Sequence, residues 1–117
     1  MRALVVFHDH GTGKLARVLR RGFRHVFVAL ELETHWLVVD GRAGVIDFAL
    51  VAPAGHDLAA FYRAEGYTVV ETAPGVVAPR APFAVADCVG LAKAVLAVRC
   101  WWAITPFALY CNLRSAP

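Results

Sequence analysis

The sequence predicts one α+β domain in which a small antiparallel sheet packs against helices. Short β-branched and aromatic segments separated by turns fill the first two thirds of the chain, and apolar residues at helical spacing fill the last third. With 117 residues, 59% of them hydrophobic and 18% charged, the chain is long and apolar enough to bury a core. No internal repeat or second compositional block appears, so the domain is expected to span residues 1–117.

The segment 24–40 gives the clearest strand signal, because it reads as two strands joined by a tight polar turn. If Leu32 and Glu33 are the turn residues, antiparallel pairing sets His25 directly opposite Asp40. Opposed residues share one face of a sheet, and an imidazole beside a carboxylate is the base and orienting half of a catalytic triad. A slip of one residue would separate the two side chains, so this pairing depends on the assumed turn.

Ahead of the hairpin, the pattern predicts a strand at residues 3–7, a polar turn at 8–13 and a helix at 14–21 that Gly22 ends. This order looks like a phosphate-binding loop, but that motif requires glycine where His8 stands and serine or threonine where Leu15 stands. The three residues 8–10, His-Asp-His, also suggest metal ligands. Neighbouring residues on an extended chain point to opposite sides, so we interpret them as a polar loop and predict no metal or cofactor site.

After the hairpin, the remaining elements of the middle of the chain are expected in this order: a turn at 41–44, a strand at 45–51, a helix at 56–65, a strand at 67–71 and a connector at 74–82. The helix at 56–65 is expected to bury its apolar face and to end at Gly66. That face consists of Leu58, Ala59, Phe61 and Tyr62.

The last third is predicted to hold two helices joined by a short apolar link at 99–104. Asp87 is a good N-cap, so Cys88 is expected as the first residue of a helix that runs to about residue 98 and buries Val89, Ala92 and Leu96. At that position the unpaired backbone N–H groups and the helix dipole favour a thiolate, which a sulfur nucleophile requires. Thr105 and Pro106 are expected to open a final helix through residue 112.

The chain has three cysteines, Cys88, Cys100 and Cys111, with no CxxC spacing. An odd number without that spacing argues against a disulfide framework or a zinc ribbon. Because Cys100 and Cys111 lie in apolar stretches away from a predicted helix N-terminus, Cys88 is expected to be the reactive thiol.

The formal net charge of +3 arises from one short basic stretch. Its basic residues are Lys14, Arg17, Arg20, Arg21 and Arg24. A basic helix can hold nucleic acid phosphates, but no aromatic residues are interleaved to stack bases, so we predict a solvated face and no specific nucleic acid binding.

The apolar fraction exceeds the usual share of a globular domain, which indicates apolar surface covered by a protein partner, with adjacent Trp101 and Trp102 as candidates. The most apolar region, residues 85–111, is interrupted by charged residues and a proline and is therefore not expected to span a membrane. No signal peptide is recognised at the N-terminus, so synthesis in the cytoplasm is expected.

Four stretches of the sequence together resemble a known family: residues 23–26, 36–40, 87–93 and 105–110. They resemble small phage- and prophage-encoded proteins of the NlpC-like, papain-type cysteine peptidase superfamily in its circularly permuted form, where the histidine strand precedes the cysteine helix. The resemblance implies a permuted papain-like fold, with Cys88 as the nucleophile, His25 as the general base and Asp40 as the residue that orients the imidazole. The apolar residues 83–86 depart from the more polar sequence usual before that cysteine.

Three functional readings follow. The first is a cysteine hydrolase of the peptidase or amidase kind, without a cofactor, acting on a peptide or amide substrate. The second is a non-catalytic structural component of a phage tail or head that retains the fold and enters the virion. The third is a phosphate- or nucleic-acid-binding module. A lone cysteine at a helix start also serves as a small buried apolar residue, and a strand histidine as a hydrogen-bonded core residue.

Overall fold

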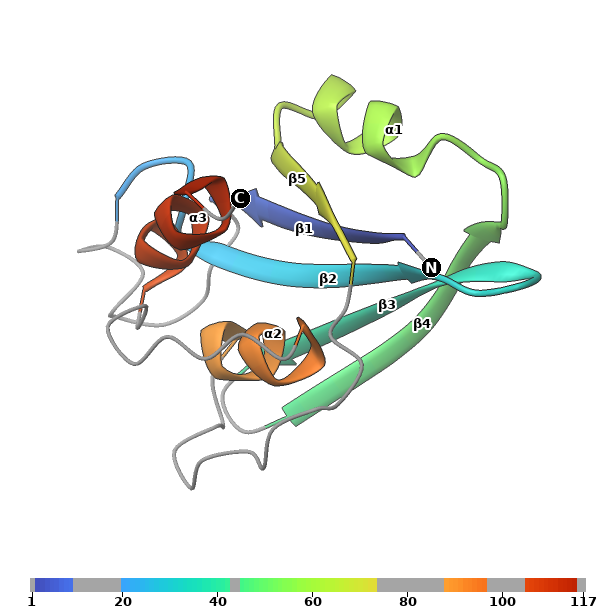
Figure 1. The fold of residues 1–117 in the computed structure, drawn as a ribbon, viewed down its shortest axis with the longest axis horizontal. Helices are drawn as coiled ribbons and strands as arrows, with labels where there is room; N and C mark the ends of the chain where they lie inside the picture. Colours follow the sequence, from blue (N-terminus) through green and yellow to red (C-terminus); the bar gives the residue numbers. More distant parts are fainter. Residues whose placement is uncertain (1, 10–19, 43–44, 74–87, 97–104, 116–117) are drawn as a thin grey trace.

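Five strands form one antiparallel sheet in the order β4-β3-β2-β1-β5 (Figure 1). The computed structural model describes residues 2–9, 20–42, 45–73, 88–96 and 105–115. The elements are β1 Ala3–His8, β2 His25–Glu31, β3 His35–Arg42, β4 Val45–Pro53, α1 Leu58–Ala64, β5 Thr68–Thr72, α2 Cys88–Leu96 and α3 Pro106–Ser115. The prediction of an α+β fold with an antiparallel sheet packed against helices is therefore confirmed.

Several predictions fall outside the described residues. They are the helix at 14–21, the connector at 74–82, the link at 99–104, the N-cap Asp87, and the residues His10, Cys100, Trp101 and Trp102.

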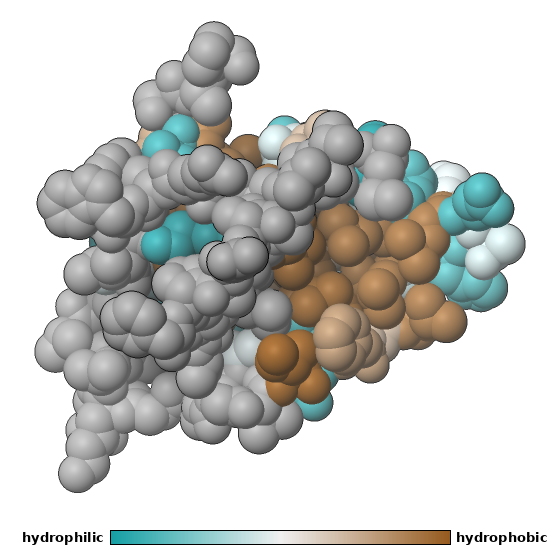
Figure 2. Space-filling model, turned by 60° about the horizontal axis from the view of Figure 1, so that its bottom comes forward, coloured by the Kyte–Doolittle hydropathy of each residue, from teal (hydrophilic) through white to brown (hydrophobic). Residues whose placement is uncertain are grey.

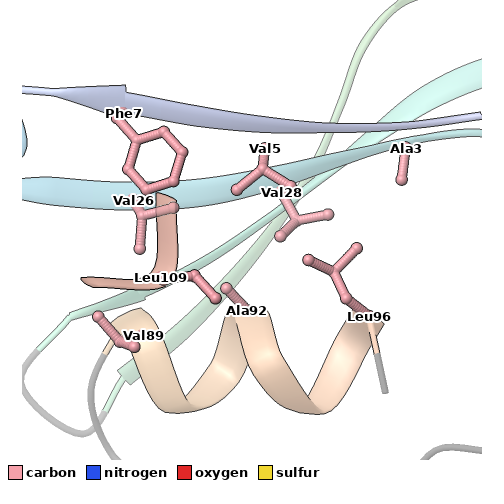
Figure 3. Close-up of a cluster of buried hydrophobic side chains, with 9 residues drawn as sticks. All are labelled: Ala3, Val5, Phe7, Val26, Val28, Val89, Ala92, Leu96 and Leu109. Atoms are coloured by element: carbon pink, nitrogen blue, oxygen red, sulfur yellow. The ribbon is translucent and has the colours of Figure 1, made fainter. Parts of the chain in front are cut away.

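Helices cover both faces of the sheet, which makes β1 its most buried strand. All six residues of β1 are buried, because α2 and α3 pack on one face and α1 on the other. Alternate residues therefore enter two separate cores, which explains why β1 reads as a continuous apolar run rather than an alternating one. The core beneath α2 and α3 (Figure 3) contains Ala3, Val5, Phe7, Val26, Val28, Val89, Ala92, Leu96 and Leu109. The core beneath α1 contains Leu4, Val6, Phe27, Ala29, Trp36, Leu58 and Ala59.

The predicted register of the β2–β3 hairpin is wrong by two residues. In the structure Glu31 pairs with Trp36 and Val28 with Val39, and the backbone N–H of Leu32 donates to the carbonyl oxygen of His35. The two central turn residues are therefore 33 and 34 rather than 32 and 33. Because side chains alternate with a period of two, this slip leaves the residues predicted to share a face on that same face.

Helix α1 begins at its N-cap Asp57, whose carboxylate accepts a hydrogen bond from the backbone N–H of Ala60 at 3.1 Å. After α1, Gly66 has a φ of 87°, a left-handed conformation that favours glycine. The helix is shorter than the predicted 56–65, and Phe61 is 51% exposed, so its place on the buried face was wrong. At about 100° per residue, Phe61 is turned well away from the stripe through Leu58 and Ala59 that faces the sheet.

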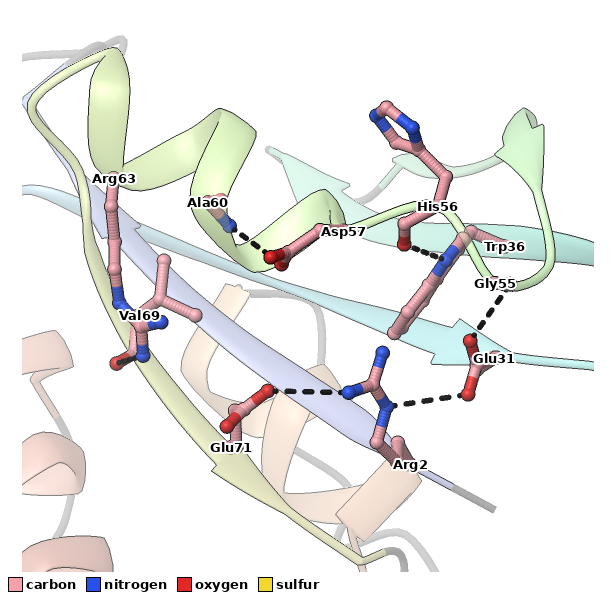
Figure 4. Close-up of polar contacts among 10 residues, drawn as sticks. All are labelled: Arg2, Glu31, Trp36, Gly55, His56, Asp57, Ala60, Arg63, Val69 and Glu71. Atoms are coloured by element: carbon pink, nitrogen blue, oxygen red, sulfur yellow. Dashed lines mark hydrogen bonds and ion pairs between the residues drawn. The ribbon is translucent and has the colours of Figure 1, made fainter.

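Polar contacts tie α1 and its preceding loop to the sheet (Figure 4). The indole N–H of Trp36 donates to the carbonyl oxygen of His56 at 3.1 Å, and the carboxylate of Glu31 accepts from the backbone N–H of Gly55 at 3.2 Å. Arg2 lies between two carboxylates, 3.3 Å from Glu31 and 3.7 Å from Glu71. The buried indole hydrogen bond is the contact that contributes most here, because exposed ion pairs contribute little.

The outer strand β4 is exposed on both faces from residue 46 to residue 51. Several of its large apolar side chains are exposed, and Figure 2 shows a brown apolar patch on the face that it draws. Ile46, Phe48, Leu50 and Val51 are 52%, 66%, 63% and 45% exposed. The expected apolar surface is therefore present on β4, while the predicted tryptophans lie outside the described residues. No helix among the described residues is long and apolar enough to cross a membrane.

Candidate active site

Three sequence-predicted residues meet at the end of the sheet where β2 begins. His25 is the first residue of β2, Asp40 lies near the end of β3, and Cys88 is the first residue of α2. Helix α2 packs against β2 and β3, and its course is fixed by buried side chains. In Figure 3 Val89 lies near Val26, one residue after His25, whereas the far end of the helix lies toward the start of β1. Burial of this helix therefore places its N-terminus beside the histidine.

His25 and Asp40 are bonded side chain to side chain. The distance between His25 Nε2 and Asp40 Oδ1 is 2.5 Å, and their side chains are only 6% and 17% exposed. In the observed register the two residues are diagonal rather than directly opposed, because one further step beyond Val28 and Val39 sets Phe27 opposite Asp40. Diagonal neighbours on one face lie about 7–8 Å apart at the backbone, which a histidine and an aspartate can bridge with their side chains.

Cys88 lies near enough to the His25 ring to raise its pKa, as Asp40 does. Since Nε2 is engaged by Asp40, Nδ1 is the ring nitrogen free to face the cysteine. A carboxylate bonded to an imidazole with a thiol nearby is the arrangement of orienting residue, base and nucleophile in a triad. Cys88 is half-buried and free of any disulfide.

The surroundings of His25 favour its protonated form. Burial, the largest single influence, lowers the pKa of His25, but hydrogen bonds to Asp40 and Cys88 and the charges on both outweigh burial and raise the pKa from 6.5 to about 9. At neutral pH the ring therefore carries a proton that it can deliver to a leaving group.

His8 is a neighbour of this site that the sequence interpretation missed. It was assigned to a polar turn, yet it is the last residue of β1, 5% exposed and directly opposite His25. Its ring centroid lies 5.1 Å from that of His25, 5.6 Å from that of Phe27 and 4.9 Å from that of Tyr67. The apolar run of β1 does not say where the strand ends, so only the pairing with β2 reveals this contact.

A hollow of about 720 Å³ lies at the opposite end of the hairpin, away from the three residues. It is lined by Glu31, Leu32, Glu33, Ala54 and Gly55. The carboxylate of Glu31 is already engaged by Arg2 and by a backbone N–H.

Within the described parts of the chain, no group of three His, Cys, Asp or Glu side chains is arranged to hold a metal ion. Comparison of the chain with protein-family models, curated proteins and solved structures finds no match.

Proposed function

We propose that this protein is a cysteine hydrolase of the peptidase or amidase kind, with Cys88 as nucleophile, His25 as acid and base, and Asp40 as the residue that orients the ring. The observation that supports it is that one buried imidazole is bonded to a carboxylate and lies near a thiol at the start of a helix. The permuted NlpC-like family is part of this proposal, because the order of the histidine strand before the cysteine helix suggested it.

The chemistry follows the acyl-transfer pattern. The Cys88 sulfur attacks the carbonyl carbon, the C=O electron pair moves to oxygen, and the Cys88 backbone N–H helps to hold that oxyanion. His25 gives its proton to the departing nitrogen as the C–N bond breaks, which leaves a thioester on Cys88. Water then attacks the thioester while His25 takes its proton, and the acid and the thiolate are released.

The test is acylation by p-nitrophenyl acetate, an activated ester that needs only a reactive thiolate. We expect a burst of p-nitrophenol equal to the enzyme concentration and an acetyl group on Cys88 by mass spectrometry, both lost in Cys88→Ala. Cys111 is an internal control because it is a free, exposed cysteine on α3 that the proposed triad does not include. Acetylation of Cys111 in preference to Cys88 in the folded protein would overturn the proposal.

A second candidate is a structural component of a phage particle, which the exposed apolar strand β4 favours. This reading predicts a folded protein with the same His25 contacts in which acylated Cys88 is not hydrolysed. Continued release of p-nitrophenol after the burst therefore separates the two, because only a hydrolase regenerates the free thiol.

A further inference from the structure

Strand β4 is an exposed sheet edge with few of the features that usually prevent such an edge from associating. It lies at the end of the sheet, with β3 on one side, and neither α1 nor α2 covers its middle. An edge strand presents a row of backbone N–H and C=O groups, and soluble proteins usually protect such an edge with charges, prolines or bulges. In β4 the bulge falls at Val51 and the proline at Pro53, so residues 45–50 form a regular stretch with Asp47 as its one charged residue.

The faces of this stretch follow from its pairing with β3. Phe48 pairs with the buried Val39, which places it on the face covered elsewhere by α2, and Ile46 and Leu50 lie on the same face two residues to either side. Asp47 and Ala49 point to the opposite face. One face of the strand is therefore strongly apolar, and the other carries one acid and one methyl group.

We propose that two copies of this chain associate through β4, by antiparallel pairing of residues 46–50 about a twofold axis at Phe48. In this register Phe48 meets its own copy, and Ile46 meets Leu50 of the second copy. On the other face Asp47 meets Ala49, so like charges are not directly opposed. The two five-stranded sheets become one, and the edge groups of both copies are hydrogen-bonded.

Self-complementarity is the reason for a second copy rather than a different protein. In a twofold interface, a residue before the axis faces the residue at the same distance after the axis in the second copy. In residues 46–50 each such pair is compatible, because apolar side chains face apolar ones and the acid faces alanine. The pairing also brings six large apolar side chains together, three from each copy. Aromatic and aliphatic cross-strand pairs are the contacts that stabilise antiparallel sheets.

The first test is the mass in solution as a function of protein concentration, by sedimentation equilibrium. We expect a dimer for the natural chain and a monomer for Phe48→Glu, with a dissociation constant raised by at least about tenfold. Phe61→Glu is the matched control, since Phe61 is also an exposed phenylalanine but lies on α1, and this variant should remain a dimer. A natural chain that stays monomeric, or a Phe48→Glu variant that dimerises normally, overturns the proposal.

The second test fixes the register. Asp47→Cys and Ala49→Cys are mixed and oxidised, and peptides joined through positions 47 and 49 are identified by mass spectrometry, which distinguishes them from links through the native cysteines. Directly opposed residues lie within the Cα separation of about 4.4–6.8 Å that a disulfide needs. We expect the link in the mixture and not in either variant alone. Packing of the apolar faces without strand pairing would leave positions 47 and 49 unlinked, and that result also overturns the proposal.

Discussion

Two regions of the molecule show unusual burial. Where β1 ends and β2 begins, polar side chains are buried, whereas on the outer strand β4 apolar side chains are exposed. His8 and His25 are polar side chains that are each 5% exposed, whereas Phe48 and Leu50 are large apolar side chains that are mostly exposed. Scattered exposed apolar residues are common, but a buried polar cluster and a continuous apolar patch each need a cause. The buried cluster has Asp40 as a hydrogen-bonded partner and the thiol of Cys88 near it, and the exposed patch lies on the open edge of the sheet. Our two proposals account for this difference, with catalysis at the buried cluster and association through the exposed strand.

The largest expected effect is on the chemistry of the buried cluster. Asp40→Asn should lower acylation of Cys88 by up to about 10⁴-fold, because an amide can hold the wrong imidazole tautomer. Asp47→Asn is the control. Asp47 pairs directly with Asp40 across β3 and β4, but its side chain is exposed and our proposal gives it no catalytic role. Stopped-flow release of p-nitrophenol measures both. Equal acylation rates in Asp40→Asn and the natural chain would show that Asp40 does not orient His25 and only occupies the end of its strand.

The second prediction compares two phenylalanines with opposite burial. Phe7→Ala should lower the free energy of unfolding by about 3–5 kcal/mol, because Phe7 is fully buried and contacts the rings of Phe23 and Tyr110. Phe48→Ala should change it by no more than about 0.5 kcal/mol. Urea denaturation at a protein concentration low enough to keep the chain monomeric checks both values. A large loss in Phe48→Ala would mean that β4 is covered within the single chain.

The two regions also show what the sequence can and cannot predict. Helical spacing identified the buried positions Val89, Ala92 and Leu96 of α2, because a helix must bury one continuous stripe against the sheet. Strand alternation put His25 and Asp40 on one face despite the wrong turn, because the error was two residues. The buried stripe of α2 and the shared face of His25 and Asp40 both depend on nearby residues, so the residue types along the sequence are enough to predict them.

Features that depend on pairing between distant segments were not predictable in this way. The burial of His8 follows from its pairing with His25, seventeen residues later, and the exposure of β4 follows from its place at the end of the strand order. The apolar sequence of β4 resembles that of the buried β1, so composition does not distinguish an edge from a centre. The mutual contact of Cys88, His25 and Asp40 likewise requires the packing of α2 on β2 and β3.

The third prediction concerns pH and is specific to the buried cluster. Because the pKa of His25 is raised to about 9 in the folded protein, the stability that this group contributes is fully present below pH 6.5 and is lost as the pH rises through 9. The shift corresponds to about 3 kcal/mol. The difference in free energy of unfolding between the natural chain and His25→Gln should therefore shrink by that order from pH 6 to pH 9.5. A difference that is the same at both pH values would show that the ring is not held protonated.

The smallest expected effect is that of His8, which we assign a positioning role through the ring of His25. His8 lies between the rings of His25 and Tyr67, so it limits the orientations from which His25 can reach both Asp40 and Cys88. Ring contacts of this kind contribute about 0.5–1.5 kcal/mol beyond the buried area, which corresponds to a loss of no more than about tenfold in rate.

Two replacements of His8 separate packing from chemistry. His8→Ala removes the ring and should slow acylation of Cys88 by up to that tenfold, whereas His8→Phe keeps a ring of similar shape and should restore most of the rate. Acylation is followed from pH 5 to pH 9, because a purely structural loss would lower the amount of folded protein without moving the pH profile. The positioning role is supported if the pH profile of Cys88 acylation shifts in His8→Ala and matches that of the natural chain in His8→Phe. If His8→Phe is as slow as His8→Ala, a ring nitrogen of His8 takes part, and if neither is slow, the contact with His25 is incidental.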